Sequence, residues 1–170
     1  MKRPAKEEYA AYYKGYIDSV PQGDLLEIMD KQNTQFCEFF AHVNEEKAAY
    51  RYAKGKWTLK EVLGHIIDLE LVFLYRAICI SRKESQDLPG FEQEDYIKNS
   101  NYSKMTLNEL VEQFYLVRKS SVAMFKSFSP KMWALSGIAN NHRVSVRALA
   151  YIMTGHVIHH MKIINSKYLK

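Results

Sequence analysis

Three histidines carry the clearest chemical signal in the sequence, and two of them lie four residues apart. His156 and His160 fall in a run whose apolar residues recur at helical spacing, so their imidazoles lie one above the other on one face of the predicted helix. Such a pair can hold one metal ion, and a third ligand must come from another segment. We identify His65, in an earlier helical run, as the candidate third ligand.

The chemistry of this ligand set favours a catalytic metal site. A single histidine on an apolar face is usually a hydrogen-bonded core residue, but stacked imidazoles on a core stripe all need partners if they are buried. Three imidazoles without a thiolate suit zinc or nickel better than copper or iron. Three protein ligands also leave one position open, for a water or for a thiol that binds as its thiolate.

Further polar residues lie around the predicted ligands. Asp68 follows His65 by three residues and Glu61 precedes it by four, so each is a candidate to orient an imidazole or to transfer a proton. Each is explained equally well as a solvated residue at the helix edge. His159 lies about 100° around the helix axis from His160. We place His159 at the edge of the site, while a pair of His156 with His159 remains an alternative.

Four amphipathic segments are expected to position these residues. Apolar residues at helical spacing predict helices over 24–43, 58–82, 106 to Pro130, and 145–163. Thr-x-x-Glu capping boxes at Thr58 and Thr106 mark the starts of the second and third. No internal repeat or β-type alternation is visible. We therefore predict an all-α four-helix bundle in a single domain, residues 1–170, on which residues 1–23 pack as an N-terminal arm.

Histidine depth and loop length together predict the order of these helices. His65 lies about 10 Å after the start of the second helix, and His160 lies a similar distance before the end of the fourth. The histidines are level only if those helices are antiparallel. An up-down-down-up order achieves this, and it needs a long crossover between helices 2 and 3, where the loop over 84–105 lies. The same order brings that loop and the connection 50–57 toward the histidines. The candidate substrate contacts are therefore Tyr52 and Trp57 in the connection, Tyr96 in the loop, and His159 beside the site.

The second predicted helix has two apolar stripes rather than one. The additional stripe lies nearly opposite the first and comprises Leu63, Ile67, Leu71, Leu74 and Ile78. A helix that is apolar on two sides must be covered on both. Either another helix of the bundle or a second subunit could cover this stripe, and we favour a homodimer.

Composition and charge narrow the class of protein. A chain of 170 residues can bury a core without disulfides or a structural metal. Cys37 and Cys79 fall in apolar helical patterns, which favours free thiols in a reducing cytoplasm. The N-terminus does not resemble a signal peptide, and charged residues interrupt the most apolar run, 66–80, so no membrane span is expected.

The net charge of +5 is concentrated near the C-terminus, where residues 131–170 hold six Lys/Arg and no acid. A nucleic-acid-binding protein could show this pattern. However, Arg143, Arg147 and Lys162 are expected on the side of the last helix opposite its apolar stripe, without interleaved aromatics. We interpret them as a solvated outer face and expect neither a nucleic acid nor a membrane as a partner.

Several motifs together make the chain resemble the DinB/YfiT-like superfamily. They are Tyr50-Arg51-Tyr52-Ala53, Gly55-Lys56-Trp57-Thr58, the stretch 60–65 ending in Gly64-His65, Phe73 with Tyr75-Arg76-Ala77, Leu88-Pro89-Gly90-Phe91, and Gly155-His156 with His159-His160. The resemblance covers nearly the whole chain. Two departures are Lys54, where proline is common, and Leu71, where arginine is common.

This resemblance implies a bundle of up-down-down-up order, frequently dimeric, with a divalent metal on three histidines that correspond to His65, His156 and His160. Members of the family include transferases that use small thiols such as bacillithiol or mycothiol, and others are described as metal-dependent hydrolases. We therefore expect a thiol-dependent S-transferase acting on small electrophiles. The alternatives are a hydrolase that uses a metal-bound water, and a non-catalytic binding or stress-response module with a structural metal or none.

Overall fold

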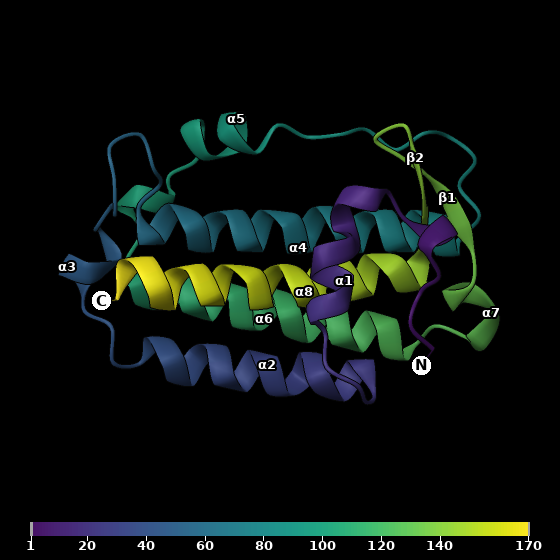
Figure 1. The fold of residues 1–170 in the computed structure, drawn as a ribbon, viewed down its shortest axis with the longest axis horizontal. Coiled ribbons are helices and arrows are strands. Elements are labelled where there is room, and N and C mark those ends of the chain that lie inside the picture. Colours follow the sequence, from purple (N-terminus) through teal and green to yellow (C-terminus); the bar gives the residue numbers. More distant parts are fainter. Residues whose placement is uncertain (1, 170) are drawn as a thin grey trace.

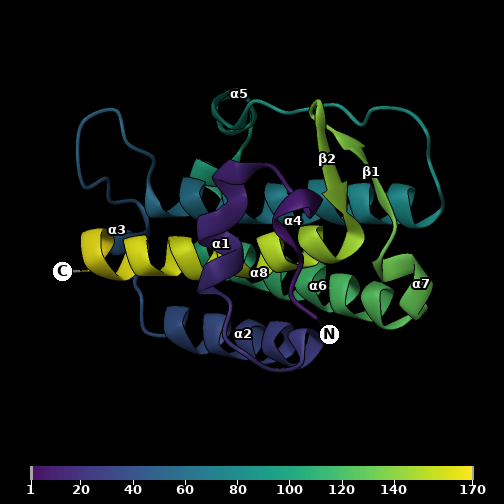
Figure 2. The same ribbon diagram turned by 45° about the vertical axis from the view of Figure 1, so that its right-hand side comes forward.

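The computed structural model describes residues 2–169 and confirms an all-α fold built on a four-helix bundle (Figure 1, Figure 2). The bundle helices are α2 (Leu25–Phe40), α4 (Leu59–Ser81), α6 (Leu107–Lys126) and α8 (Val146–Ile163). Helix α4 packs against both α6 and α8, and α2 packs mainly against α6. Figure 1 shows α4 and α6 running in one direction and α2 and α8 in the other, which confirms the up-down-down-up order.

Side-chain caps fix where the bundle helices begin. Thr58 and Thr106 each accept a hydrogen bond from the backbone N–H of a glutamate three residues on, and that glutamate bonds back to the cap. Asp24 and Ser145 cap α2 and α8 in the same position. Helix α2 ends at Phe40 rather than near 43, because the chain turns there into the short helix α3 (Glu45–Ala48).

The long crossover connects the end of α4 to the start of α6 and makes these two helices parallel. It contains the short helix α5 (Gln93–Lys98) and a 3-10 turn, Tyr102–Lys104. In Figure 1 and Figure 2 it runs back along α4, and α5 lies beside that helix. The loop predicted over 84–105 is therefore confirmed as the crossover, although part of it is helical.

The sequence predicts no β structure, and this prediction is wrong between α6 and α8. After α7 (Pro130–Trp133), β1 (Ser136–Ala139) and β2 (His142–Ser145) form an antiparallel hairpin in which Ala139 pairs with His142. The two turn residues, Asn140 and Asn141, have φ of 53° and 62°. Positive φ at both positions is the signature of a tight two-residue hairpin turn, and asparagine tolerates it better than most residues.

The N-terminal segment lies across the outer side of α8. It comprises two 3-10 turns, Lys6–Glu8 and Ala11–Tyr13, and the helix α1 (Lys14–Ser19), which crosses α8 in both views (Figure 1, Figure 2). The crossing is close because Gly155 has no side chain: a Cβ there would lie 2.0 Å from the carbonyl oxygen of Tyr16. Ile17 on α1 is completely buried.

This segment changes the interpretation of the basic face of α8. Glu8 forms an ion pair with Arg147 and accepts a hydrogen bond of 2.7 Å from the Ser145 hydroxyl. The prediction of a solvated outer face is therefore wrong for Arg147, which is partly buried, whereas Arg143 and Lys162 are exposed. With one side on the bundle and the other under the N-terminal segment, α8 is buried at every residue over 148–157.

The bundle itself covers most of the second apolar stripe of α4. Leu63 and Ile67 are fully buried, and Leu74 is 8% exposed, against helices of the same chain. Ile78 is partly buried, and Leu71 has 46% of its surface exposed. The stripe therefore does not require a second subunit. Among residues 2–169, no helix has the length and apolar character that crossing a membrane demands.

Candidate metal centre

The antiparallel packing of α4 and α8 brings three histidines to one point. The Nε2 atom of His156 lies 2.9 Å from Nε2 of His65 and 3.0 Å from Nε2 of His160. The candidate ligand atoms of the three rings all lie within 4.8 Å of one another. Two come from adjacent turns of α8 and one from α4, as the matching depths in the sequence indicate. His159, on the same helix, is not part of this cluster.

Protein groups alone do not satisfy this arrangement. A neutral imidazole nitrogen has either one proton or one lone pair, so Nε2 of His156 can serve both neighbours only by sharing that single group between them. The Nδ1 atom of His156 is buried and has no hydrogen-bond partner. A cation that accepts a lone pair from each Nε2 atom resolves the conflict, and the residues present therefore fit a divalent metal.

Burial keeps the three rings in the form that binds metals. It lowers the pKa of His65 to about 4. Burial, with the charges of neighbouring histidines, lowers the pKa of His160 to about 3 and that of His156 well below its ordinary value. All three imidazoles are thus neutral at pH 7, and a metal ion need not displace a proton from them.

A pocket of about 620 Å³ extends from the histidines. Its walls come from six parts of the chain: the N-terminal segment, the connection before α4, the helix α4, the helix α8, the crossover and the hairpin turn. The lining residues besides the three candidate ligands are Tyr12, Tyr13, Tyr16, Trp57, Leu69, Phe73, Arg76, Phe91, Glu92, Gln93, Asn140 and His159. A pocket of this size accommodates a small molecule.

Aromatic rings surround the histidine end of this pocket. The indole of Trp57 lies 5.0 Å from the His65 ring, centroid to centroid. The Tyr16 ring stands edge-on to His156 at 5.6 Å and to His159 at 5.2 Å. His159 itself is exposed. Of the four candidate substrate contacts, the structure brings Trp57 and His159 into the pocket.

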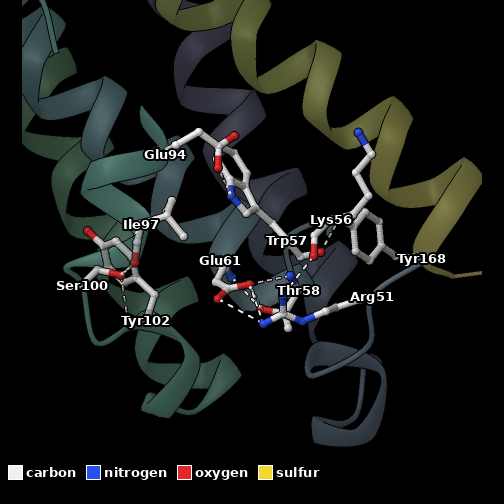
Figure 3. A network of polar contacts seen from close by, with 10 residues as sticks. All are labelled: Arg51, Lys56, Trp57, Thr58, Glu61, Glu94, Ile97, Ser100, Tyr102 and Tyr168. Atoms are coloured by element: carbon white, nitrogen blue, oxygen red, sulfur yellow. Dashed lines mark hydrogen bonds and ion pairs between the residues drawn. The ribbon is translucent and has the colours of Figure 1, made fainter. Parts of the chain in front are cut away.

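Figure 3 shows the polar contacts that hold Trp57 in place. Its indole Nε1 donates to a carboxylate oxygen of Glu94 on α5, at 3.1 Å. Its carbonyl oxygen accepts from the Tyr168 hydroxyl at 2.8 Å. The crossover and the π-helical turn that follows α8, Ile164–Tyr168, thus fix this wall of the pocket together.

The two carboxylates predicted near His65 lie outside the pocket lining. Glu61 completes the capping box: its Oε2 accepts from the Thr58 backbone N–H at 2.7 Å, and Arg51 lies 3.4 Å from it (Figure 3). Asp68 accepts a hydrogen bond of 2.6 Å from Tyr102. Burial raises the pKa of Asp68, and this hydrogen bond opposes the change. A role for either residue in orienting His65 or moving protons stays a prediction.

The other two tyrosines predicted as substrate contacts lie beside the main pocket. The Tyr52 ring packs against Tyr168 at 5.0 Å and lines a neighbouring hollow that also reaches His160. The Tyr96 ring packs against Phe91 at 5.0 Å and is 45% exposed. Neither side chain lines the 620 Å³ pocket.

Several pocket residues were missed from sequence. Tyr13 and Tyr16 belong to a tyrosine-rich stretch, but nothing in the sequence says which helix that stretch crosses. Arg76 interrupts the most apolar run of the chain, which is a signal of a functional cation, since a charge in a buried helix needs a reason. Asn140 reaches the pocket through the unexpected hairpin turn.

The fold and the site define a class: an α-helical bundle whose antiparallel helices hold three convergent, neutral histidines beside a small-molecule pocket. The model of the DinB superfamily matches residues 28–164, and the chain belongs to this family. The comparison with curated protein sequences returned no match.

Two solved structures share the fold at low sequence identity. The first is YfiT from Bacillus subtilis, described as a probable metal-dependent hydrolase with an unusual four-helix bundle topology. Its TM-score is 0.71 at 10% sequence identity, and the match covers 86% of this chain and 90% of YfiT. The second is a mycothiol-dependent maleylpyruvate isomerase, with a TM-score of 0.67 at 11% identity, over 85% of this chain and 60% of that one.

Proposed function

We propose that this protein is a metal-dependent S-transferase that joins a low-molecular-weight thiol to a small electrophile. The observation that carries the proposal is the convergence of three neutral imidazoles, those of His65 and His156 buried and that of His160 partly buried, at one end of a pocket of about 620 Å³. A thiol-dependent enzyme among the structures of the same fold supports the thiol as substrate.

The residues that would hold the ion are His65, His156 and His160, and the donor set suits zinc or nickel. A bound divalent ion would lower the pKa of a coordinated thiol or water, and so supply a nucleophile at neutral pH. His65 and His156 are buried, and all three candidate ligands line the pocket, so a ligand reaches them from the pocket side.

The chain's own residues orient the reactants and limit access of water. Trp57, Tyr16 and Phe73 supply flat apolar walls against which an electrophile can pack. In the transfer, the thiolate sulfur forms a bond to an electrophilic carbon, and the leaving group departs from that carbon with its electron pair. The aromatic walls bring the two reactants together and exclude competing water.

Hydrolysis by an activated water is the second candidate, and the description of YfiT as a probable metal-dependent hydrolase favours it. The same open position at the histidines would then receive water instead of a thiol. The two activities differ in their products, because transfer leaves the thiol attached to the electrophile and hydrolysis leaves it free.

We also propose a cytoplasmic location and a homodimer. Free cysteines at Cys37 and Cys79 agree with a reducing compartment. For the dimer, the outer side of α4 offers Leu71 and Tyr75, which are four residues apart and are 46% and 57% exposed. Light scattering of the wild type and of a Leu71→Glu variant tests this: the variant should be monomeric, and a monomeric wild type overturns the dimer.

A screen of the metal-loaded protein tests the activity. Monochlorobimane is offered with bacillithiol, mycothiol, glutathione or cysteine, and nitrophenyl acetate is offered without thiol. We expect a fluorescent thiol adduct whose formation requires the metal and all three histidines. Ester cleavage without adduct formation would favour hydrolysis. No turnover in either assay, with a metal that stabilises the fold and has no open position, would identify a non-catalytic module.

A further inference from the structure

A buried positive charge lines the pocket away from the neutral histidines. Arg76 on α4 lines the pocket and is only 4% exposed. Its guanidinium carries a permanent positive charge. None of the ion pairs found among residues 2–169 includes Arg76. Its Nη2 donates to the carbonyl oxygen of Pro89 at 2.6 Å, and its buried Nε has no hydrogen-bond partner.

The chain treats its other deeply buried arginine differently. Arg118 on α6 is fully buried, and Glu70 meets it with two carboxylate oxygens, at 2.8 and 2.9 Å. A buried guanidinium that lacks a carboxylate is costly to the fold, because it gives up water without gaining a counter-charge. For Arg76 the missing partner is a carboxylate, and the pocket is where one can enter.

The surroundings of Arg76 leave its charge available to a ligand. The guanidinium carbon lies 5.1 Å from the centroid of the Phe73 ring and 6.0 Å from that of Phe91, so aromatic rings hold the group without neutralising it. The side chain of Tyr13 hydrogen-bonds to the guanidinium, and Tyr12 lies close to it, but a neutral phenol supplies no counter-charge. Asp87 attracts the guanidinium more weakly and forms no ion pair with it. Within the described part of the chain, Glu92 is the only acidic residue of the pocket lining, and it is exposed to solvent, where its charge is screened.

Helix geometry sets the distance between the two ends of the pocket. Arg76 follows His65 by eleven residues, which is about three turns of α4, so both side chains leave the helix on the same side, roughly 16 Å apart along its axis. Side chains on a helix lean toward its N-terminus, and the arginine side chain is longer than that of histidine, so the guanidinium lies closer to the histidines than the backbone spacing alone implies.

We propose that Arg76 binds a carboxylate of the small-molecule ligand, which lies along α4 with its reacting group at the histidines and its carboxylate at the guanidinium. The reacting end of this ligand rests on the proposed function, whereas the anchor rests on Arg76 itself. The planar guanidinium matches a carboxylate through paired N–H donors, which lysine cannot reproduce. The substrate class is therefore a carboxylic acid whose reactive atom is separated from the carboxylate by several bonds.

Mercaptocarboxylic acids of increasing length test this arrangement on the cobalt(II)-loaded protein. Mercaptoacetate, mercaptohexanoate and mercaptooctanoate are each compared with the mercaptoalcohol of the same length, and binding is followed by the thiolate-to-cobalt absorbance. We expect the acid to bind about tenfold more tightly than its alcohol at the length that spans the pocket, since a bidentate charged pair is worth about that factor, and no preference for mercaptoacetate. Arg76→Met should abolish the preference and Arg76→Lys should reduce it.

A control and a metal-free arm separate the possible failures. Arg82→Met makes the same change on an exposed arginine of the same region and should keep the preference. If alcohols and acids bind equally at every length, the anchor is wrong and the proposed function stands. If no thiol reaches the metal, the proposed function fails, and octanoate on the metal-free protein then tests whether Arg76 binds a carboxylate. Octanoate should raise the melting temperature of the wild type but not that of Arg76→Met. Equal shifts in the two proteins overturn the inference. If Arg76→Met does not fold, the comparison of Arg76→Lys with the wild type decides in both arms.

Discussion

Gly155→Ala should loosen the N-terminal segment from the bundle. The new Cβ would lie 2.0 Å from the carbonyl oxygen of Tyr16, a backbone atom that no side-chain rotation can move. Relief to an ordinary contact of about 3.5 Å requires α1 to shift by more than 1 Å, and overpacking of this kind costs about 1–3 kcal/mol. Alanine is also the better helix former by about 1 kcal/mol. We therefore expect a net loss of up to about 2 kcal/mol relative to the wild type, and of about 1–3 kcal/mol relative to a Gly→Ala change that has no clash.

The assay is urea unfolding followed by circular dichroism, with Gly15→Ala as the matched control. A Cβ at Gly15 meets nothing within 4 Å, so that variant should keep or gain up to about 1 kcal/mol from helix propensity alone. Gly155→Ala should also weaken ligand binding in the pocket, because Tyr13 and Tyr16 move with α1. A Gly155→Ala protein that is as stable as Gly15→Ala would refute the close crossing of α1 over α8.

Three further changes probe the fold around the site. Glu70→Gln and Arg118→Met should each lower the free energy of unfolding by about 3–5 kcal/mol, because each leaves a buried charge unpaired. The double variant should recover much of that loss in the same unfolding assay. Losses that simply add in the double variant would contradict the pairing. Burial raises the pKa of Glu8, but hydrogen bonds led by that of Arg147 outweigh it and lower the pKa from 4.5 to about 2. The contribution of Glu8 to the free energy of unfolding is therefore present above pH 4.5 and is lost as the pH falls toward 2. Melting temperatures of wild type and Glu8→Gln should thus differ at pH 6 and converge near pH 2, and a constant difference would be inconsistent with the ion pair. Removal of the metal with a chelator should lower the melting temperature while the helical circular-dichroism signal at 25 °C persists, because the core is complete without it; a chelator-induced loss of helix would indicate a structural metal.

The bundle was predictable because its signals are local and mutually consistent. Capping boxes at Thr58 and Thr106 place two helix starts correctly, and the helical spacing of apolar residues identifies the helices that begin there. The convergence of His65 with the pair on α8 required one further step, from helix depth and crossover length to antiparallel packing. Both quantities can be read from a sequence, since rise per residue is nearly constant in a helix.

The parts that escaped prediction depend on tertiary contacts. The hairpin consists of two four-residue strands, too short for an alternating pattern, and its turn is made by asparagines rather than glycine. The sequence shows tyrosines before residue 20 but not that α1 crosses α8 at Gly155. Glu61 completes the capping box predicted at Thr58 and lies outside the pocket lining, and its role beside His65 stays a prediction.

Elemental analysis of the purified protein, before and after loading with zinc or nickel, tests the metal centre most directly. We expect one divalent ion per chain, and loss of that ion in His65→Ala, His156→Ala and His160→Ala with the helical signal retained. His142→Ala, an exposed histidine in the hairpin, should bind the ion like the wild type. A wild-type protein that holds no ion and cannot be loaded, or a variant lacking all three histidines that binds as well as the wild type, would contradict the metal centre.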